Sequence, residues 1–300
     1  MTSSRLRPPP ARLLAAVAAL ALLGTRPARA QGTSPTLRLE EIVADSHSFH
    51  VVSTLIVGPT EVVLFDTQNR LSDGRRVADR IAATGKRLKA IFISHPDEDH
   101  FFGALAIVDQ FPGTPIYMTP AAIAEFGRTA EGMRLQGKQG LGAEVPDSLF
   151  HPQAYPAGGL AVDGVPLQLL ADLQGDVLHP TNSAIWIPSL RAVLAGDIVF
   201  NGVYPYLAAS TPGSRTAWQG SLDSLAALHP DVVVAGHKAS ADLPDTPAAL
   251  EFMHHYLRDF DAARASAANV REMITTIRAK YPDLTVAMLL GYSAMQTFRQ

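Results

Sequence analysis

Cysteine is absent from the 300-residue chain. This absence excludes disulfide bonds, thiolate metal ligands and a cysteine nucleophile. A metal bound by this chain would therefore be held by histidine and carboxylate side chains. The length suits one large α/β domain or two small ones, and hydrophobic residues make up 47% of the sequence, which is enough for a sizeable core, so we expect a globular protein.

Basic residues are scarce outside the N-terminal segment. Residues 1–30 contain five arginines and no acid, so the rest of the chain has 20 basic and 28 acidic residues, a formal charge of −8. An acidic chain without clusters of Lys and Arg does not attract a phosphate backbone. We therefore expect a small-molecule substrate and no nucleic acid partner, whereas the sequence does not predict an oligomeric state.

Long apolar runs are missing too, apart from residues 13–23. Three arginines precede this run, and the small-x-small sequence Ala-Arg-Ala follows it at 28–30. This order predicts a signal peptide over residues 1–30, cleaved near Ala30, and an exported mature chain over 31–300 that is periplasmic or secreted. No later stretch approaches the roughly 20 apolar residues that a membrane helix needs, so we expect no stable membrane anchor.

The apolar pattern beyond residue 31 predicts one α/β domain with helices between its strands. A capping residue followed by proline marks helix starts at Thr119 and Thr246, and the second of these opens a C-terminal helical segment over about 247–300. The glycine- and glutamine-containing segment 132–142 is typical of an exposed loop. The expected strands are 51–57, 61–66, 88–94, 167–171, 184–188, 191–195 and 231–235, with a helix over 73–84.

Candidate metal ligands are most concentrated directly after the predicted strand 88–94. His95, Asp97, Asp99 and His100 lie within six positions there. Histidine and carboxylate are the common ligands of borderline and hard metals in proteins. This density predicts a metal site at the end of the strand.

Single candidates follow other predicted strands. Asp66 closes the hairpin, Asp197 and His237 each follow a strand through one glycine, and His179 precedes the strand 184–188. The carboxyl ends of strands in α/β sheets are where loops converge to build sites, and glycine lets the backbone approach closely. We therefore expect these side chains to join the cluster at 95–100.

These residues, in this order, resemble the metallo-β-lactamase superfamily, whose signature is HxHxDH followed by single His, Asp and His ligands. The resemblance implies an αββα sandwich with one or two metals, usually zinc, at one edge. It also implies that His95 and His179 are ligands of the first metal, that Asp99, His100 and His237 belong to the second, that Asp197 bridges them, and that Asp66 orients a ligand.

One position departs from the signature, because Asp97 stands where the family has its second histidine and the motif reads HxDxDH. A carboxylate adds negative charge and a harder oxygen ligand. Asp97 then coordinates directly or through water, the first metal is lost, or the site prefers iron or manganese. Flavodiiron proteins of the same superfamily resemble this variant, since they have Glu there and bind iron. We expect no counterpart of their flavin domain, because the chain after His237 is short.

The chemistry expected from the resemblance is metal-assisted hydrolysis of an ester, a lactone or an amide such as a β-lactam. Asp99 is the residue expected to orient water and pass a proton to the leaving group. The alternatives are an iron redox enzyme of the same fold and a non-catalytic protein that binds a metal or a ligand. The segment 201–215 is the expected substrate-facing loop. The aromatic candidates for substrate contact are Phe102, Trp186, Tyr204 and Tyr206.

Overall fold

The structure is a computed structural model that describes Met1 and residues 36–299. The expected signal peptide and its cleavage position lie outside the described residues and stay predictions. Within the part of the chain that is described, helices and strands alternate in a mixed α/β arrangement. No helix in this part is both long enough and apolar enough to cross a membrane.

Two larger sheets and one short strand pair make up the β structure. The first sheet has six strands in the order β1-β2-β3-β4-β5-β6, and the second has five in the order β12-β10-β9-β8-β7, while β11 pairs with β13. The first sheet is antiparallel from β1 to β3 and parallel from β3 to β6. The strands are β1 (Arg38–Val43), β2 (Val52–Val57), β3 (Glu61–Phe65), β4 (Arg87–Phe92), β5 (Ile116–Met118), β6 (Gln153–Ala154), β7 (Leu160–Val162), β8 (Val165–Leu173), β9 (Asn182–Ile187), β10 (Ala192–Leu194), β11 (Phe200–Asn201), β12 (Val232–Val234) and β13 (His237–Lys238).

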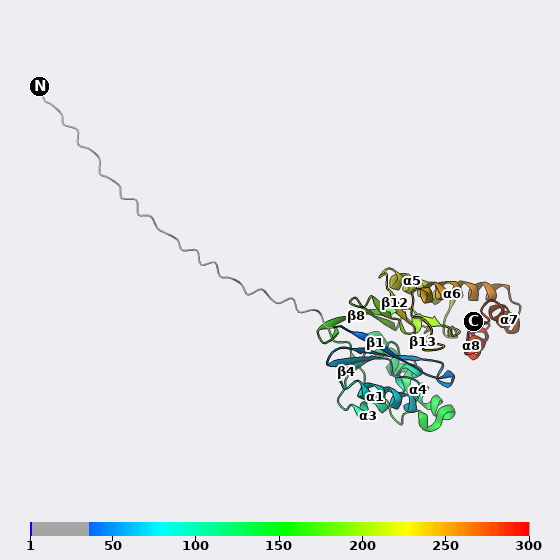
Figure 1. Cartoon of the computed structure of the whole chain (residues 1–300). Coiled ribbons are helices and arrows are strands. Elements are labelled where there is room, and N and C mark those ends of the chain that lie inside the picture. The colour runs from blue at the N-terminus through cyan, green and yellow to red at the C-terminus, as the bar shows by residue number, and fades with distance from the viewer. Residues whose placement is uncertain (2–35, 300) are drawn as a thin grey trace. The chain divides into compact units, whose positions relative to one another are not determined.

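Helices cover the outer face of each sheet (Figure 1). The helices α1, α3 and α4 lie on the side of the first sheet, and α5 and α6 lie on the side of the second. The α-helices are α1 (Leu71–Ala83), α2 (Glu98–Phe101), α3 (Ala104–Gln110), α4 (Pro120–Leu141), α5 (Pro212–Ala226), α6 (Ala248–Ser266), α7 (Val270–Lys280) and α8 (Ala287–Thr297). Three 3-10 turns accompany them: η1 (Ser46–Ser48), η2 (Gly142–Glu144) and η3 (Gly196–Ile198). The order of layers is helix, sheet, sheet, helix, as the αββα expectation requires.

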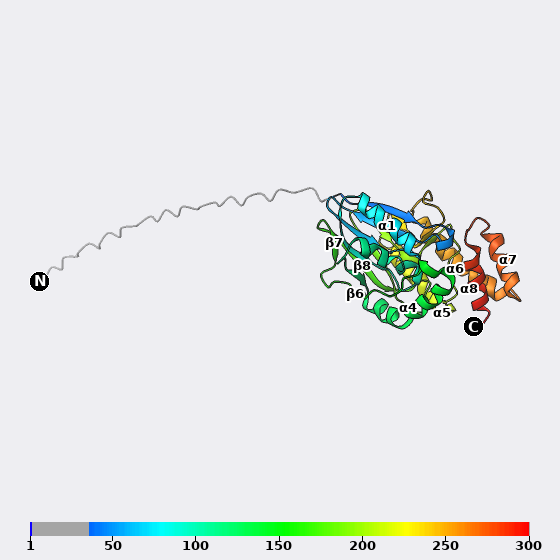
Figure 2. The same cartoon turned by 90° about the horizontal axis from the view of Figure 1, so that it is seen from below.

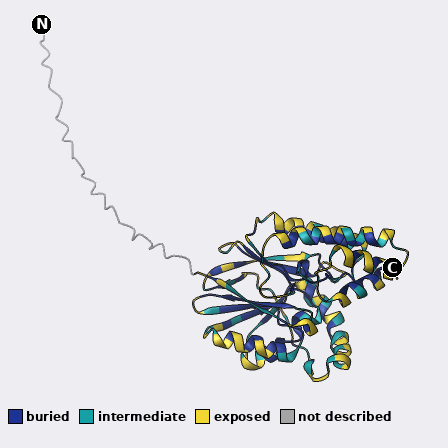
Figure 3. Cartoon of the chain, turned by 45° about the vertical axis from the view of Figure 1, so that its right-hand side comes forward, coloured by how far each residue is buried: buried dark blue, intermediate teal, exposed yellow. Residues whose placement is uncertain are grey.

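Alternation along the strands builds the three apolar cores. In β4, Ala90 and Phe92 point between the sheets, whereas Ile91 points to the helices of the first layer. In β9, Ile185 points between the sheets and Trp186 points to the helices of the second layer. Successive side chains of a strand point to opposite faces, so strands buried on both faces need apolar residues at nearly every position. Figure 3 shows this as dark strands and helices that are exposed along their outer faces.

The predicted strands match observed ones within a few residues, and the cap at Thr119 is confirmed, since its side chain accepts a hydrogen bond from Ala122 N at 3.2 Å. The loop expected over 132–142 is wrong, because α4 continues to Leu141. Leucine, methionine, glutamine, lysine and arginine between the glycines are strong helix formers, and they outweigh the cost of about 1 kcal/mol per glycine. Gly137 also has a packing role, since a Cβ there would meet the Phe102 ring at 3.0 Å.

The C-terminal helical segment is confirmed, and it consists of α6, α7 and α8. Figure 2 shows the three helices together at one end of the sandwich. The expected start at Thr246 is shifted, because α6 begins at Ala248 and receives no side-chain cap.

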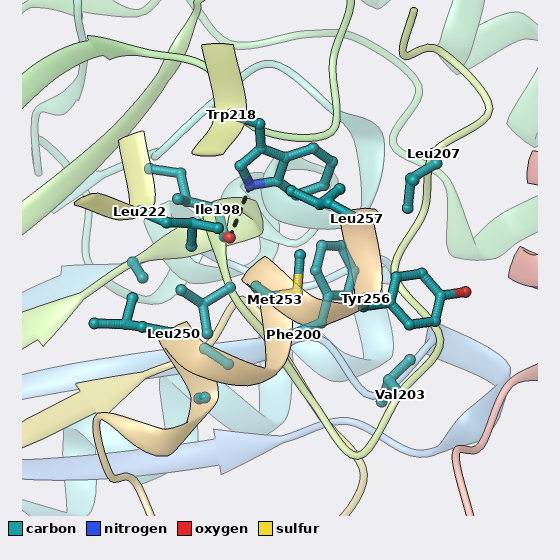
Figure 4. Packing of buried hydrophobic residues seen from close by; sticks show 14 of the residues in the cluster. Ile198, Phe200, Val203, Leu207, Trp218, Leu222, Leu250, Met253, Tyr256 and Leu257 are labelled. Atoms are coloured by element: carbon teal, nitrogen blue, oxygen red, sulfur yellow. Dashed lines mark hydrogen bonds between the residues drawn. The ribbon is translucent and has the colours of Figure 1, made fainter. Parts of the chain in front are cut away.

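The second-layer core reaches the residues predicted as ligands. Trp218 of α5 donates a hydrogen bond from Nε1 to the carbonyl of Ile198 at 2.9 Å, which Figure 4 draws as a dashed line. This bond holds the short turn η3 that carries Asp197. Phe200 in the same core stacks on the His237 ring, with centroids 5.1 Å apart and an interplanar angle of 6°. Packing of this core therefore fixes two of the site residues.

Candidate metal centre

The loops at the carboxyl ends of β4, β8, β10 and β12 bring the candidate ligands to one place. Asp97 precedes α2, whose short helix carries Asp99 and His100. Asp197 lies in η3, and His237 begins β13. Residues far apart in the sequence thereby face one another.

One group of side chains is rich in nitrogen and includes both His100 and His237. Asp197 approaches His100 Nε2 at 3.1 Å through Oδ1 and His237 Nε2 at 3.0 Å through Oδ2. Asp99 lies 3.7 Å from His100 Nε2 and 3.4 Å from His237 Nε2. Asp197 also lies close to His95, because Asp197, His95 and His100 form another set of side chains near enough to share a metal. It has the position expected of a bridging carboxylate.

A second group is rich in oxygen and contains His95, Asp97 and Asp176. Both carboxylates lie 3.9 Å from His95 Nε2. Asp176 is 1% exposed, and Asn182 donates a hydrogen bond to its Oδ1 at 3.4 Å. Asp176 therefore occupies the place that the sequence analysis gave to His179.

His179 lies three positions further along the same loop and is exposed. It lines the edge of the adjoining cavity, but it does not belong to any group of described side chains close enough to share a metal. The signal for Asp176 was present in the sequence. Glycine precedes Asp176 directly, as it does Asp197 and His237, so the same pattern marks all three residues.

The opposite nitrogen of each histidine is held by a neighbour. Ser94 Oγ lies 2.9 Å from His95 Nδ1, Asp66 Oδ2 lies 2.9 Å from His100 Nδ1, and the carbonyl of Phe49 lies 2.8 Å from His237 Nδ1. Such contacts fix the tautomer and the orientation of a metal-binding imidazole. Asp66 is fully buried and also accepts hydrogen bonds from Ser94 N at 2.7 Å and Ser94 Oγ at 2.8 Å. The structure thus places Asp66 where it orients His100.

Two glycines permit the close approach of these loops. A Cβ on Gly236 would overlap Asp197 Oδ1 and come within 2.6 Å of Gly196 C. Gly196 has a φ of +52°, and a Cβ there would lie 2.9 Å from Ser94 Oγ. Both positions therefore need glycine for space, and Gly196 also needs it for its left-handed backbone.

His100, His237 and Asp197 stabilise one another's charged forms. Burial acts to raise the pKa of Asp197, but His237 and His100 outweigh it and hold the pKa well below its usual value. Burial acts to lower the pKa of His100, but Asp197 and Asp66 hold it well above its usual value. Burial lowers the pKa of His95, and the adjacent His100 lowers it further. Neutral imidazole at His95 is the form that binds a metal.

Negative charges crowd the oxygen-rich group. Burial raises the pKa of Asp97 well above its usual value, and Glu98 and Asp99 raise it further. Burial also raises the pKa of Asp176, and Asp197 and Asp97 add to the effect. A cation among these carboxylates would offset both the burial and the mutual repulsion.

Unpartnered atoms provide the test of whether a metal fits. His95 Nε2, His100 Nε2 and Asp197 Oδ1 are buried, and although the last two approach each other to 3.1 Å, none of the three makes a hydrogen bond to a described residue. Buried polar atoms are costly when they are left unsatisfied. Because these atoms face one another in a set of imidazoles and carboxylates, the residues fit a divalent metal.

A cavity of about 600 Å³ opens directly onto both groups. Tyr206 lines it, as the sequence analysis expected of a substrate-facing residue. Phe102, Trp186 and Tyr204 do not line it. Phe102 packs in the core under the helices of the first layer, and strand alternation turns Trp186 towards the helices of the second layer. Tyr204 is buried and donates a hydrogen bond from its hydroxyl to the Tyr281 carbonyl at 2.7 Å. The lining residues are Phe49, Asp97, Glu98, Asp99, Glu125, Thr129, Met133, Gln136, Asp176, Val177, Leu178, His179, Thr181, Asp197, Tyr206, Ala209, His237, Met288, Leu289 and Tyr292.

Comparison with protein families adds an independent observation. The family model described as the metallo-beta-lactamase superfamily matches residues 49–237, which is more than half of the chain and includes every candidate ligand. The chain belongs to the metallo-beta-lactamase superfamily. The resemblance given by the motifs is therefore confirmed, although no curated protein matches the chain.

Solved structures of this superfamily share the fold. A metallo-beta-lactamase family protein from Thermus thermophilus is 19% identical with a TM-score of 0.59, and the match covers 88% of this chain and 93% of that one. The metallo-beta-lactamase DIM-1, solved after exposure to ceftazidime, is 16% identical with a TM-score of 0.55, covering 75% and 97% of the two chains. A metallo-beta-lactamase from Erythrobacter litoralis with beta-mercaptoethanol in its active site is 16% identical with a TM-score of 0.52, covering 74% and 92%. At these identities the likeness shows the fold alone.

Proposed function

We propose that the protein is an exported, metal-dependent hydrolase that cleaves a small carbonyl substrate such as an ester, a lactone or an amide. One observation carries the proposal. Three histidines, each held through Nδ1, turn their Nε2 atoms towards four carboxylates at one wall of a cavity that is large enough for a small molecule.

The two groups of ligands differ in their chemistry, and we assign different ions to them. The nitrogen-rich group of His100, His237 and their carboxylates suits zinc. The oxygen-rich group of His95, Asp97 and Asp176 suits a harder ion such as Mn²⁺ or Fe²⁺. When bound, divalent ions supply Lewis acidity, which brings the ionisation of water close to neutral pH and polarises a carbonyl.

Asp99 is proposed as the catalytic acid and base. It lines the cavity beside both histidines of the nitrogen-rich group, and its side chain is 15% exposed. In hydrolysis, the water oxygen bonds to the carbonyl carbon while the bond to the leaving oxygen or nitrogen breaks. Asp99 accepts the proton of the attacking water and passes it to the departing alcohol or amine.

Tyr206 is proposed to position the substrate. Burial raises the pKa of its hydroxyl, and the neighbouring carboxylates of Asp97 and Asp176 raise it further. The phenol therefore stays protonated at neutral pH and can donate a hydrogen bond into the cavity.

The proposal is tested with the metal-loaded protein and para-nitrophenyl butyrate, by following acid and alcohol release in equal amounts. We expect turnover that a chelator abolishes, and a loss of kcat of about 100-fold in Asp99→Asn, in the range usual for acid–base groups. Asp109→Asn changes an exposed acid that does not line the cavity and should behave like the wild type. Full activity in Asp99→Asn would exclude the assigned role, and oxygen consumption without hydrolysis would favour the iron redox alternative.

Export is proposed from the N-terminal sequence and is tested separately. Expression of the full chain in a Gram-negative host should yield a periplasmic or secreted form whose mass corresponds to a start at Gln31. A cytoplasmic, full-length product would contradict this part of the proposal.

A further inference from the structure

The cavity beside the metal centre has many acids and no lysine or arginine among the described residues that line it. If two divalent ions are bound, they would offset four of the six carboxylates, and the formal charge of these carboxylates and ions together would be −2. A negatively charged substrate would therefore meet repulsion and would find no cationic side chain to pair with. The six acids are Asp97, Glu98, Asp99, Glu125, Asp176 and Asp197.

An apolar wall also lines this cavity. Tyr206, Met288, Leu289 and Tyr292 contribute to it, together with Leu178 from the loop between β8 and β9. Leu178 is 53% exposed, Met288 is 49% exposed and Tyr292 is 47% exposed. Several large, exposed apolar side chains at one cavity mouth are typical of a surface that binds an apolar ligand.

The helix α4 lines part of the cavity and carries a residue whose substitution can test the effect of charge. Glu125, Thr129, Met133 and Gln136 line the cavity at spacings of four, four and three residues. This spacing places all four on one helical face. Gln136 is exposed at the mouth and carries no charge, so a cation introduced there would supply the partner that an anionic substrate lacks.

We propose that the substrate is a neutral ester or lactone whose apolar acyl group lies against the wall formed by α8, and that the cavity discriminates against carboxylate-bearing compounds. This inference rests on the proposed hydrolase function and narrows it. Antibiotics of the β-lactam class generally carry a carboxylate, so they are disfavoured substrates. The acidic lining provides the discrimination, and Met288 and Tyr292 provide the acyl contact.

Binding of two fluorescent probes tests this selectivity without any turnover. N-phenylnaphthylamine is neutral, and anilinonaphthalene sulfonate has the same ring system with a negative charge. On the metal-loaded protein we expect the neutral probe to bind at least about 10-fold more tightly. Equal binding of the two probes, or tighter binding of the sulfonate, would overturn the inference.

Variants at the mouth locate the effect. Gln136→Lys should strengthen binding of the sulfonate by about 5-fold or more, a gain ordinary for one added charge near the site. Met288→Ser should weaken binding of the neutral probe, whereas Met295→Ser, which changes an exposed methionine of the same helix outside the cavity lining, should leave it unchanged. If neither Gln136→Lys nor Met288→Ser changes the affinity for the probes, the probes bind elsewhere and the proposal is refuted.

Kinetics with matched esters separate this inference from the proposed function. We expect kcat/KM for para-nitrophenyl butyrate to exceed that for the anionic para-nitrophenyl monosuccinate by about 100-fold, and Gln136→Lys to narrow the ratio. Hydrolysis of both esters at similar rates would overturn the charge selectivity but keep the hydrolase. If the protein prefers the neutral probe but hydrolyses no ester or lactone, the proposed hydrolase function is overturned, whereas the inference that the ligand is neutral and apolar is kept.

Discussion

Replacement of Asp66 by asparagine is the sharpest test of how the nitrogen-rich group is held. Asp66 does not face the cavity; it is fully buried behind His100. Its carboxylate contacts His100 Nδ1 at 2.9 Å and accepts two hydrogen bonds from Ser94. Asp66→Asn keeps the size of the side chain and removes its charge.

The expected magnitude follows from these contacts. The amide can still occupy the same space, but it no longer supports the imidazole with a negative charge. Changes in residues that orient metal ligands usually cost about 10- to 100-fold in metal affinity, or about 1.4 to 2.7 kcal/mol. We expect a loss of this size for zinc at the nitrogen-rich group, with little change for the second ion that we propose at Asp97 and Asp176.

Competition with a chromogenic zinc chelator measures this loss directly and needs no substrate. Asp73→Asn is the matched control, because Asp73 is also buried and also accepts a serine hydrogen bond, from Ser48 Oγ at 2.6 Å, but it does not contact a candidate ligand. Zinc affinity in Asp66→Asn equal to that of the wild type and of Asp73→Asn would refute the reasoning.

Three further predictions concern the frame of the site. Trp218→Phe removes the hydrogen bond to Ile198 and part of the buried volume, so the free energy of unfolding measured in urea should fall by about 2 kcal/mol. An unchanged free energy of unfolding would argue against the role of this core in holding the turn η3. Gly236→Ala should abolish metal binding, as measured by elemental analysis, because its Cβ would overlap Asp197; full metal content would contradict the packing. Burial raises the pKa of Glu41 to about 7, and a hydrogen bond with Asp245 contributes to this rise. The folded state therefore favours the protonated carboxyl, and the free energy of unfolding should decline as the pH rises from about 4.5 to 7. In Glu41→Gln this decline, on the order of 2 kcal/mol, should be missing, and parallel stability curves for the two proteins would exclude the assignment.

The sequence was sufficient for the parts of the site that are local. His95, Asp97, Asp99 and His100 follow one buried strand, so a single turn of chain brings them together. Asp197 could be predicted because it also follows a strand through glycine, where the chain must approach closely.

The ligand from the loop between β8 and β9 could not be assigned by residue type alone. His179 is the more usual metal ligand, but the position along an irregular loop is set by packing, which has no periodic signal. The structure buries Asp176 through its contact with Asn182, and Gly175 has no room for a side chain, since a Cβ there would lie 2.6 Å from Asn182 Nδ2. Tertiary contacts therefore place Asp176 beside His95, while His179, three positions further along, stays exposed and remains an untested prediction.

The cavity wall was harder to predict for the same reason. Aromatic residues near the motifs were plausible candidates, but strand alternation and core packing took Phe102 and Trp186 away from the cavity. Seven of the twenty lining residues come from α4 and α8, which lie outside the motifs, so the motifs give no indication of this contact. A helical period indicates which face of a helix is apolar, but it does not indicate which site that face adjoins.

The proposed function requires that this chain hydrolyse a carbonyl compound with bound metal. Its most direct test is the turnover of a neutral ester by metal-stripped protein as zinc and manganese are added back in measured equivalents. We expect no turnover without metal and a rate that rises to a plateau at one or two ions per chain. Turnover by the stripped protein, or its absence from fully loaded protein across esters, lactones and amides, would contradict it.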